Sequence, residues 1–380
     1  MDIFFLWAWI AIEIVLVSIW SVQLRTAFQR YRWRNDKISH LSLQDTPTIS
    51  VCIPARNETH ALTDCLTAVL ASDYPKLEVI VLDDCSQDNT SQLIRSFANS
   101  GVRFIEGEVP PTGWLGRNHA LEVLSKNASG KYLLFMGVDT RVEPGTITQL
   151  ANYMFAKRAS MVSVLPQRSR NVSIGILFST LRYFWQLLLP QFLHTPASAS
   201  LWLIRAAALE EAGGFAPLQA KVSPENTLAQ QFAAKSTYRF LLSDTELGAY
   251  YSKKWSSQVD TAIRLYYPAL YKNPGIVLLS MLGLTLAYVA PFIVVAYQIL
   301  SGSASLATVV LGAVCVGFGA VYALFVRTAY GQPWLFGFVS FPLVMVQEII
   351  LLAVSMIGYV TGRVNWKGRN ICYPVLRRKF

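Results

Sequence analysis

Hydrophobic residues are distributed unevenly along this chain, with long apolar runs near both ends and shorter runs in the middle. The long runs cover residues 1–22, 275–300, 304–326 and 334–360. A helix of about 20 apolar residues is long enough to cross a lipid bilayer. The pattern therefore predicts one membrane helix near the N-terminus and three near the C-terminus.

The middle of the chain alternates between short β-rich runs and stretches with helical spacing of apolar residues. Residues 48–54 (TISVCIP) and 77–82 (LEVIVL) are typical of strands, and residues 60–70 between them of a helix. Two further helical stretches, 91–98 and 118–124, lead into VRFIEG and KYLLFMGVD. This order predicts a mainly parallel sheet covered by helices, with ligands at the carboxyl ends of the strands.

The composition indicates a chain that lies partly in a membrane. Of the 380 residues, 53% are hydrophobic and 15% are charged, and the net charge is +10. Basic residues gather at 25–37 and 362–380, beside apolar runs, where they favour the cytoplasmic side. This placement explains the positive charge without a nucleic-acid partner. Basic residues that follow the first apolar run favour a spanning anchor over a cleaved signal peptide.

Two rules conflict about the side of the membrane on which the C-terminus lies. If the middle of the chain is cytoplasmic, three further crossings would place the C-terminus outside. The tail 362–380, however, is densely basic and should stay inside. Pro342, Gln347 and Glu348 interrupt the last apolar run, and polar residues at that depth are costly. A re-entrant or membrane-surface element in place of the last crossing stays open, and a cytoplasmic C-terminus is favoured.

Polar residues follow each of the predicted strands. Residues 55–58 follow the first strand, residues 83–90 the second, and Asp139 follows KYLLFMGV. Adjacent carboxylates at a strand end repel one another unless hydrogen-bond donors or a divalent cation satisfy them. Turn and helix-cap roles explain Ser86 and Asp88 alone, but not the whole set.

Four sequence motifs follow one another along the chain: IPARNE, VIVLDDCSQDNT, PTGWLGRNHAL and VDTRVEPG. The series resembles family 2 glycosyltransferases of the GT-A fold, and most of all their membrane-attached, lipid-acting subgroup. That subgroup contains hopanoid-associated, carotenoid-associated and ceramide glucosyltransferase-like proteins. ASLWLIRAAALEEAGGF is similar to its acceptor-lining segment, and GRVNWKGR to its C-terminal end. The resemblance implies an α/β GT-A domain with a mainly parallel sheet and transmembrane helices at both ends.

Pattern and resemblance together predict the order of segments along the chain. They are an N-terminal transmembrane helix (1–24), a basic linker (25–47), a cytoplasmic GT-A domain (48–260), a juxtamembrane segment (261–274), three membrane helices (275–361) and a basic tail (362–380). Within the domain, residues 174–192 are apolar but interrupted by Arg182 and Pro190. We expect this segment to lie in the membrane surface, with Tyr183 and Trp185 at headgroup level, and a buried core helix is the alternative.

The resemblance also implies the residues of the substrate sites. The donor would lie against Pro54, Ala55, Arg56, Glu58, Asp83, Asp84, Arg117, Asn118, Val138 and Arg264, and the acceptor against Arg205, Gly213 and Gly214. Asp84 would read the base. Arg117 would face the diphosphate or the sugar, a role that suits a guanidinium. Arg264 would meet the diphosphate, although the family's Gln-x-x-Arg-Trp pattern is absent and a juxtamembrane cation explains it equally well.

The two positions that carry the family's chemistry both differ here. The Asp-x-Asp motif falls on Gly137-Val138-Asp139, so that Asp139 alone would hold Mg²⁺ or Mn²⁺; Mg²⁺ commonly takes only one or two protein carboxylates. The general base falls on Glu225, where the longer side chain moves the carboxylate by about 1 Å, a shift that can cost about a hundredfold in rate. A first-turn helix acid is the alternative role for Glu225.

These features predict an enzyme of the cell (inner) membrane that moves a hexose from a nucleotide diphosphate sugar, UDP-linked, to a lipid acceptor with inversion. The two substitutions leave open a pseudo-glycosyltransferase that acts as a membrane binding or scaffold protein. A processive polysaccharide synthase is less favoured because Gln-x-x-Arg-Trp is missing, and a transporter because no repeat is visible. The sugar, the lipid and the oligomeric state stay open.

Overall fold

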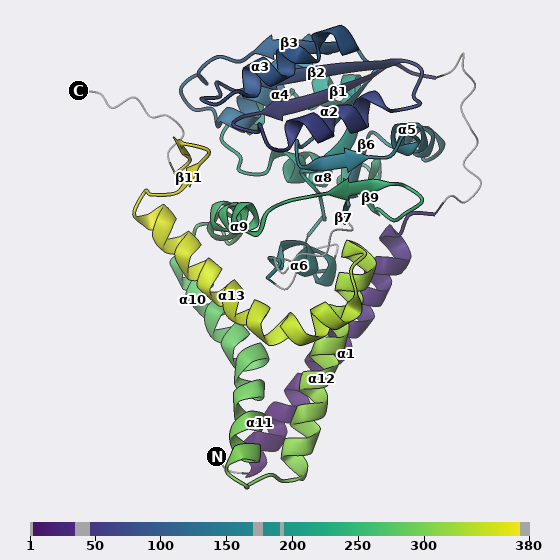
Figure 1. Cartoon of the computed structure of the whole chain (residues 1–380). Coiled ribbons are helices and arrows are strands. Elements are labelled where there is room, and N and C mark those ends of the chain that lie inside the picture. The colour runs from purple at the N-terminus through teal and green to yellow at the C-terminus, as the bar shows by residue number, and fades with distance from the viewer. Residues whose placement is uncertain (1–2, 35–45, 170–177, 191–193, 373–380) are drawn as a thin grey trace. The chain divides into compact units, whose positions relative to one another are not determined.

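The computed structural model describes residues 3–34, 46–169, 178–190 and 194–372, which divide into two compact units (Figure 1). The helical unit is formed by Met1–Arg30, Arg170–Leu193 and Lys253–Trp366. The sheet unit is formed by Tyr31–Ser169, His194–Ser252 and Lys367–Phe380. Each unit therefore combines segments that lie far apart in the sequence.

The sheet unit is built on a seven-stranded sheet in the order β3-β2-β1-β4-β8-β6-β9. Its strands are β1 (Ile49–Ala55), β2 (Leu77–Asp83), β3 (Val102–Glu106), β4 (Tyr132–Met136), β6 (Met161–Leu165), β8 (Leu201–Arg205) and β9 (Tyr238–Leu242). Strand β8 is antiparallel to β4 and β6, and the other neighbours pair in parallel. The predicted mainly parallel sheet is confirmed.

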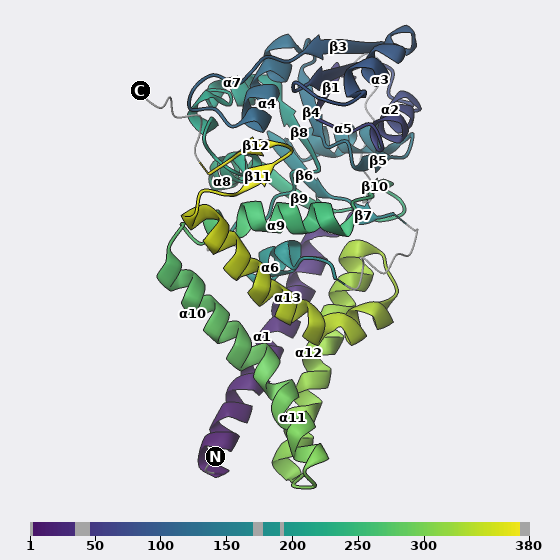
Figure 2. The same ribbon diagram turned by 60° about the vertical axis from the view of Figure 1, so that its left-hand side comes forward.

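Helices cover both faces of this sheet, which explains why its strands are almost continuously apolar. They are α2 (Leu62–Leu70), α3 (Thr90–Ser96), α4 (Gly116–Asn127), α5 (Thr146–Ala156), α7 (Ala206–Glu211) and α8 (Pro224–Ala234). Leu66 of α2 and Leu150 of α5 share one buried cluster with Val51 of β1 and Val162 of β6. Helices α4 and α7 lie on the other side of the strands (Figure 2).

The register brings the ends of three strands to one edge of the sheet. Ala55 at the end of β1 is paired with Asp83 at the end of β2, and Cys52 with Phe135 of β4. A small second sheet follows in the order β5-β10-β7, from β5 (Thr140–Val142), β10 (Ala249–Tyr251) and β7 (Gln167–Arg168). Since β5 begins just after Asp139, this residue sits at the same carboxyl edge as the loops after β1 and β2.

The helical unit contains eight helical segments among its described residues. They are α1 (Ile3–Tyr31, whose last residue belongs to the sheet unit), α6 (Arg182–Leu188), α9 (Trp255–Ala269), α10 (Pro274–Leu284), the π-helical turn Thr285–Val289, α11 (Ala290–Leu300), α12 (Leu306–Tyr330) and α13 (Trp334–Val360). Among the described residues, four helices are long and apolar enough to cross a membrane: 4–31, 274–300, 306–330 and 334–360. The predicted apolar helices at both ends are thus confirmed.

Two details of these helices differ from the expected segments. Helix α1 continues through Arg25 and Arg30, so that the first part of the predicted linker is helical. Helix α13 continues through Pro342 without a break, and it packs against α12 and α9. Leu6 and Ile10 of α1 pack against α12.

Helix α6 is the described part of the segment that we expected at the membrane surface; 174–177 and 191–192 lie outside the described residues. Phe184 is fully buried, and its ring centroid lies 5.2 Å from that of Trp20. The indole of Trp185 donates a 2.9 Å hydrogen bond to Glu348 of α13, which also accepts from the Tyr266 hydroxyl at 2.9 Å. Helix α6 therefore packs within the helical unit, and its place at the membrane surface stays a prediction.

Candidate active site

The loops that follow β1 and β2 are locked together by hydrogen bonds. Asn57 and Cys85 have φ angles of 51° and 54°, in the left-handed region. The Asn57 amide donates to the Ser86 hydroxyl at 2.9 Å, and the Gln87 amide donates back to the Asn57 side chain at 2.8 Å. Arg56 donates to the backbone carbonyls of Asp84 and Cys85. The guanidinium of Arg56 thus braces backbone at the predicted donor site, and its contact with the donor stays a prediction.

The adjacent acids Asp83 and Asp84 have different partners. Asp83 accepts hydrogen bonds from the Ser86 amide and the Ser91 hydroxyl, which are turn and helix-start contacts. Asp84 accepts from Arg369 through both carboxylate oxygens, at 2.7 and 2.6 Å. Burial raises the pKa of Asp84, and Arg369 opposes that rise. Asp84 is thus paired with a cation from the end of the chain and Asp83 with the loop that follows it, and the donor contacts of both stay predictions.

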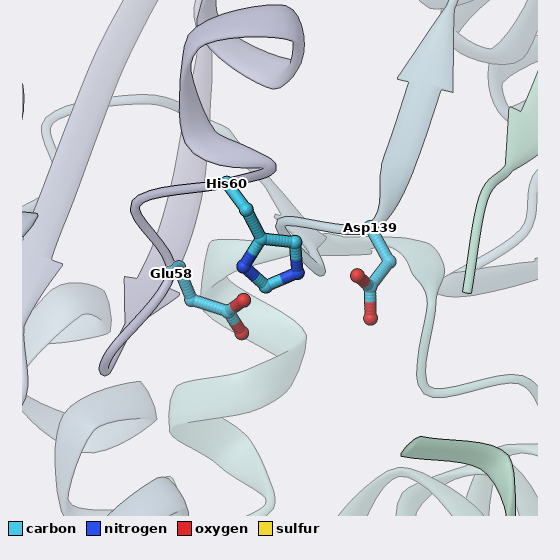
Figure 3. A group of neighbouring side chains, drawn as sticks. All are labelled: Glu58, His60 and Asp139. Carbon is cyan, nitrogen blue, oxygen red and sulfur yellow. The ribbon is translucent and has the colours of Figure 1, made fainter. Parts of the chain in front are cut away.

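Three side chains with metal-binding atoms meet at the carboxyl edge (Figure 3). Glu58 and His60 come from the loop after β1, and Asp139 follows β4; their ligand atoms all lie within 4.8 Å of one another. Burial raises the pKa of Glu58, the Lys367 ammonium opposes the rise, and the Asp139 carboxylate adds to it. His60 was missed in the sequence, where its only signal is its place two residues after Glu58.

This group of side chains is chemically suited to a divalent cation. Two carboxylates and one imidazole suit Mn²⁺ better than Mg²⁺, which prefers a set of oxygen ligands. Glu58, in the loop after β1, offers this group a second carboxylate in place of the acid that is missing at position 137. Packing does not require glycine at 137: the nearest atoms to an added Cβ would lie 3.9 Å away.

Arg141 ties the two loops that carry these ligands. Its guanidinium donates to the carbonyl of Val138 at 2.6 Å and to that of Ala61 at 2.9 Å. Val138 and Ala55 are both buried, and their contacts with a donor stay predictions. Pro54 is half-buried at the end of β1. Arg141 therefore joins the backbone next to Asp139 to the backbone next to His60.

The predicted base and the predicted diphosphate contact form an ion pair. Arg117, the second residue of α4, places Nη1 3.0 Å from Oε2 of Glu225 in the first turn of α8. Glu225 is only 1% exposed. A neighbouring guanidinium favours the ionised form of a buried carboxylate, which is the form that accepts a proton.

Asn118, the next residue of α4, has a structural role. Its side-chain amide donates to the carbonyls of Leu218 and Lys221, both at 2.8 Å, and it is almost completely buried. These bonds hold the segment that leads into α8 and therefore position Glu225. The predicted direct contact of Asn118 with the donor stays a prediction.

Of the predicted acceptor residues, Arg205 lies at the opposite edge of the sheet, and Gly213 and Gly214 form a turn. Because β8 is antiparallel, Arg205 pairs with Tyr132 at the start of β4, at the sheet edge opposite to Asp139. Gly213 and Gly214 have φ angles of 86° and 65° in the turn after α7, a conformation that favours glycine. The part of β8 that does reach the site is its start, where the Ser200 carbonyl accepts from the Gly137 amide.

Three further basic side chains, Arg264, Lys367 and Arg369, belong to two different units. Arg264 belongs to the helical unit, where its guanidinium lies 4.9 Å from the Trp366 ring centroid, and its role at the donor stays a prediction. Lys367 and Arg369 belong to the sheet unit and pair with Glu58 and Asp84. Both were missed because the sequence places them in a basic tail, and the similarity of GRVNWKGR to the family's C-terminal end was their only signal.

Known proteins resemble this chain in sequence and in fold. Over 101 residues it is 33% identical to poly-β-1,6-N-acetyl-D-glucosamine synthase of Staphylococcus epidermidis, covering 26% of this chain and 24% of that protein. Over 95 residues it is 30% identical to UDP-Glc:α-D-GlcNAc-diphosphoundecaprenol β-1,3-glucosyltransferase WfgD of Escherichia coli, covering 25% and 36%. The matches thus span between a quarter and about a third of these relatives.

A solved structure and a family model agree with these matches. Mannosyltransferase PcManGT from Pyrobaculum calidifontis, in complex with GDP-Man and Mn²⁺, superposes with a TM-score of 0.58 at 17% identity, over 93% of this chain and 97% of that one. Residues 50–211 match the model of glycosyl transferase family 2. The mainly parallel sheet, its carboxyl-edge site and these matches agree: the domain that begins with β1 has the GT-A fold and is similar over residues 50–211 to glycosyl transferase family 2.

Proposed function

We propose that this protein is a membrane glycosyltransferase that transfers a hexose from a UDP-linked sugar to a lipid acceptor, with inversion and with a divalent cation. The observation that carries the proposal is the pairing of Arg117 with the buried Glu225, in the same sheet unit as the group formed by Glu58, His60 and Asp139. Sugar transfer from a nucleotide diphosphate requires a general base for the acceptor hydroxyl, a basic side chain for the phosphates and a metal-binding group. Glu225, Arg117 and the group around Asp139 supply these three parts.

Glu225 acts as the general base. Its carboxylate accepts the proton of the acceptor hydroxyl as that oxygen attacks the sugar carbon, and a single displacement inverts the configuration. Arg117 orients the carboxylate through one of its five N–H groups and leaves others for the diphosphate.

Asp139, Glu58 and His60 would hold the divalent cation. The bound ion supplies positive charge that stabilises the departing nucleotide diphosphate. The Mn²⁺ in the complex of the Pyrobaculum calidifontis mannosyltransferase supports the use of a divalent cation here.

Two observations support the proposed UDP-sugar donor and lipid acceptor. The Escherichia coli relative is named for a UDP-Glc donor and a diphosphoundecaprenol-linked acceptor. Four membrane-length helices in the same chain support an acceptor that resides in a membrane.

The residues of the sheet unit support a proposal for which segments lie on the cytoplasmic side of the membrane. Basic residues after the first apolar run support a cytoplasmic sheet unit in the cell (inner) membrane. Lys367 and Arg369 bind Glu58 and Asp84 within that unit, so the chain after α13 lies on the same side. With α10–α11 and α12 as a pair of crossings, α13 begins and ends on the cytoplasmic side. Cytoplasmic labelling of single cysteines placed at 333 and 362 tests this topology, and opposite accessibility would contradict it.

The activity is tested with the purified chain in detergent. Release of UDP is measured with Mn²⁺ and a panel of UDP-sugars, with and without total membrane lipid. We expect release that depends on lipid and is lost in Asp139→Ala and in Glu225→Gln. Binding of nucleotide without release across the panel would instead favour the pseudo-glycosyltransferase.

A further inference from the structure

A tight turn at residues 367–370 reaches the carboxyl edge from the far end of the chain. Lys367 and Gly368 have φ angles of 47° and 79°, and Arg369 opens the short strand β12 (Arg369–Asn370). Two successive positive φ angles favour Asn-Gly or Gly-Gly. A lysine in this conformation is strained, and strained residues persist where the surroundings hold them and cluster at functional sites.

The surroundings hold this C-terminal turn at both ends. The Arg56 Nε donates to the Lys367 carbonyl at 2.9 Å, and the Lys367 ammonium donates to the Arg56 carbonyl at 2.7 Å. The same ammonium pairs with Glu58, and Arg369 binds both oxygens of Asp84. Two cations of the C-terminal turn thus hold two carboxylates of the candidate active site.

The start of α4 is shaped to admit Arg369. A Cβ on Gly116, the first residue of this helix, would lie 2.2 Å from Nη1 of Arg369. A cation at the N-terminus of a helix is unfavourable unless an anion lies between them. Asp84 supplies one such anion, and the backbone N–H groups at the start of α4 face the same position.

The position of Lys367 conflicts with a metal ion at the same site. Glu58 is the carboxylate that Lys367 holds and is also one of the three candidate ligands. A divalent cation that binds Glu58 and Asp139 would repel the ammonium, so Lys367 must then find another anion. A nucleotide diphosphate that arrives with the cation is such an anion.

We propose that Lys367 couples metal binding to donor binding: it holds Glu58 while the site is empty and moves to the donor diphosphate when the cation takes Glu58. Arg369 stays on Asp84 and keeps the C-terminal turn in place. This inference rests on the proposed function for the class of donor. Its consequence is that Mn²⁺ alone binds weakly, because it must displace Lys367, whereas Mn²⁺ with UDP binds strongly.

The test measures Mn²⁺ binding by electron paramagnetic resonance on the purified full chain in detergent, with and without UDP. In the wild type we expect UDP to strengthen Mn²⁺ binding by about tenfold or more, a usual size for coupling between two ligands. In Lys367→Met we expect Mn²⁺ alone to bind several-fold more tightly and the effect of UDP to fall several-fold, the remainder coming from direct attraction between the ion and the diphosphate.

Two control variants separate the charge of Lys367 from a general effect of substitution. Lys367→Arg keeps the charge and should keep most of the coupling. Lys131→Met removes an exposed lysine next to Tyr132, at the opposite edge of the sheet, and should bind like the wild type.

The outcomes also separate this inference from the proposed function. Unchanged coupling in Lys367→Met, or weaker binding of Mn²⁺ alone in that variant, would overturn the role of Lys367. Coupled binding of Mn²⁺ and UDP without sugar transfer would support the inference and overturn the proposed function. A wild-type chain that binds neither Mn²⁺ nor UDP would overturn both.

Discussion

Two glutamates are buried to almost the same extent in the two units, and their partners differ in charge. Glu225 of the sheet unit is 1% exposed and meets the Arg117 guanidinium at 3.0 Å. Glu348 of the helical unit is 2% exposed and accepts hydrogen bonds from the neutral side chains of Trp185 and Tyr266. Burial by itself therefore does not identify a glutamate that could act as a general base.

The partners decide what each carboxylate can do. An ion pair favours the charged form of Glu225, and a charged carboxylate can accept a proton from a substrate. Glu348 instead joins α13 to the Trp185 and Tyr266 side chains of α6 and α9, which makes it a packing element of the helical unit. The comparison predicts that changes at Glu225 affect turnover and that changes at Glu348 affect stability.

The largest effect should come from Glu225→Gln. The glutamine keeps the shape of the side chain and a hydrogen bond to Arg117 but cannot accept the proton, so the rate of lipid-dependent UDP release should fall by about 10² to 10⁴-fold. The thermal midpoint in detergent should fall as well, because Arg117 loses its charged partner, so turnover is measured in the folded fraction. Turnover within a factor of about three of the wild type would break the comparison and make Glu225 an ordinary first-turn acid.

Asp139→Asn should have the next largest effect. A neutral amide is a poor substitute for a carboxylate ligand, and losing part of the cation's stabilisation should lower turnover by about a hundredfold. Excess Mn²⁺ should restore part of the rate, since Glu58 and His60 remain. No response to Mn²⁺ in either the variant or the wild type would contradict a metal-dependent reaction.

Glu348→Ala should lower stability and leave the chemistry intact. It deprives the half-buried Trp185 indole and the buried Tyr266 hydroxyl of their acceptor, and an unsatisfied buried group costs about 1–3 kcal/mol. We expect a lower thermal midpoint and, in the folded fraction, a turnover within about threefold of the wild type. Ile350→Ala, at an exposed position of the same helix, is the control and should change neither quantity.

The smallest effect should come from Gly137→Asp, which restores the acid that this chain lacks. An added Cβ has its nearest neighbours at 3.9 Å, so we expect the variant to fold. Titration with Mn²⁺ should show binding that is tighter by a factor of about ten or less, because one more carboxylate joins a site that already has two. Gly137→Asn has the same size without the charge, and tighter binding in that variant as well would contradict an electrostatic cause.

Much of the fold could be predicted because the signals that define it are local. Apolar runs marked all four membrane-length helices, and period and length separated the strands from the helices of the sheet unit. The rule that parallel strands share a carboxyl edge then pointed to Glu58, Asp84 and Asp139 before any contact was known.

The tertiary structure decided which of these side chains are available to a ligand. The antiparallel direction of β8 placed Arg205 at the opposite edge, and Arg56 and Asn118 each donate to backbone carbonyls, contacts that the sequence did not reveal.

Only the tertiary structure brought His60 beside Asp139 and Lys367 onto Glu58. Hydrophobic periodicity is set by neighbours along the chain, whereas an ion pair between residues 58 and 367 depends on how distant segments pack. The sequence by itself therefore determined the elements and the edge at which the chemistry gathers, and packing between distant segments determined which residues form the site.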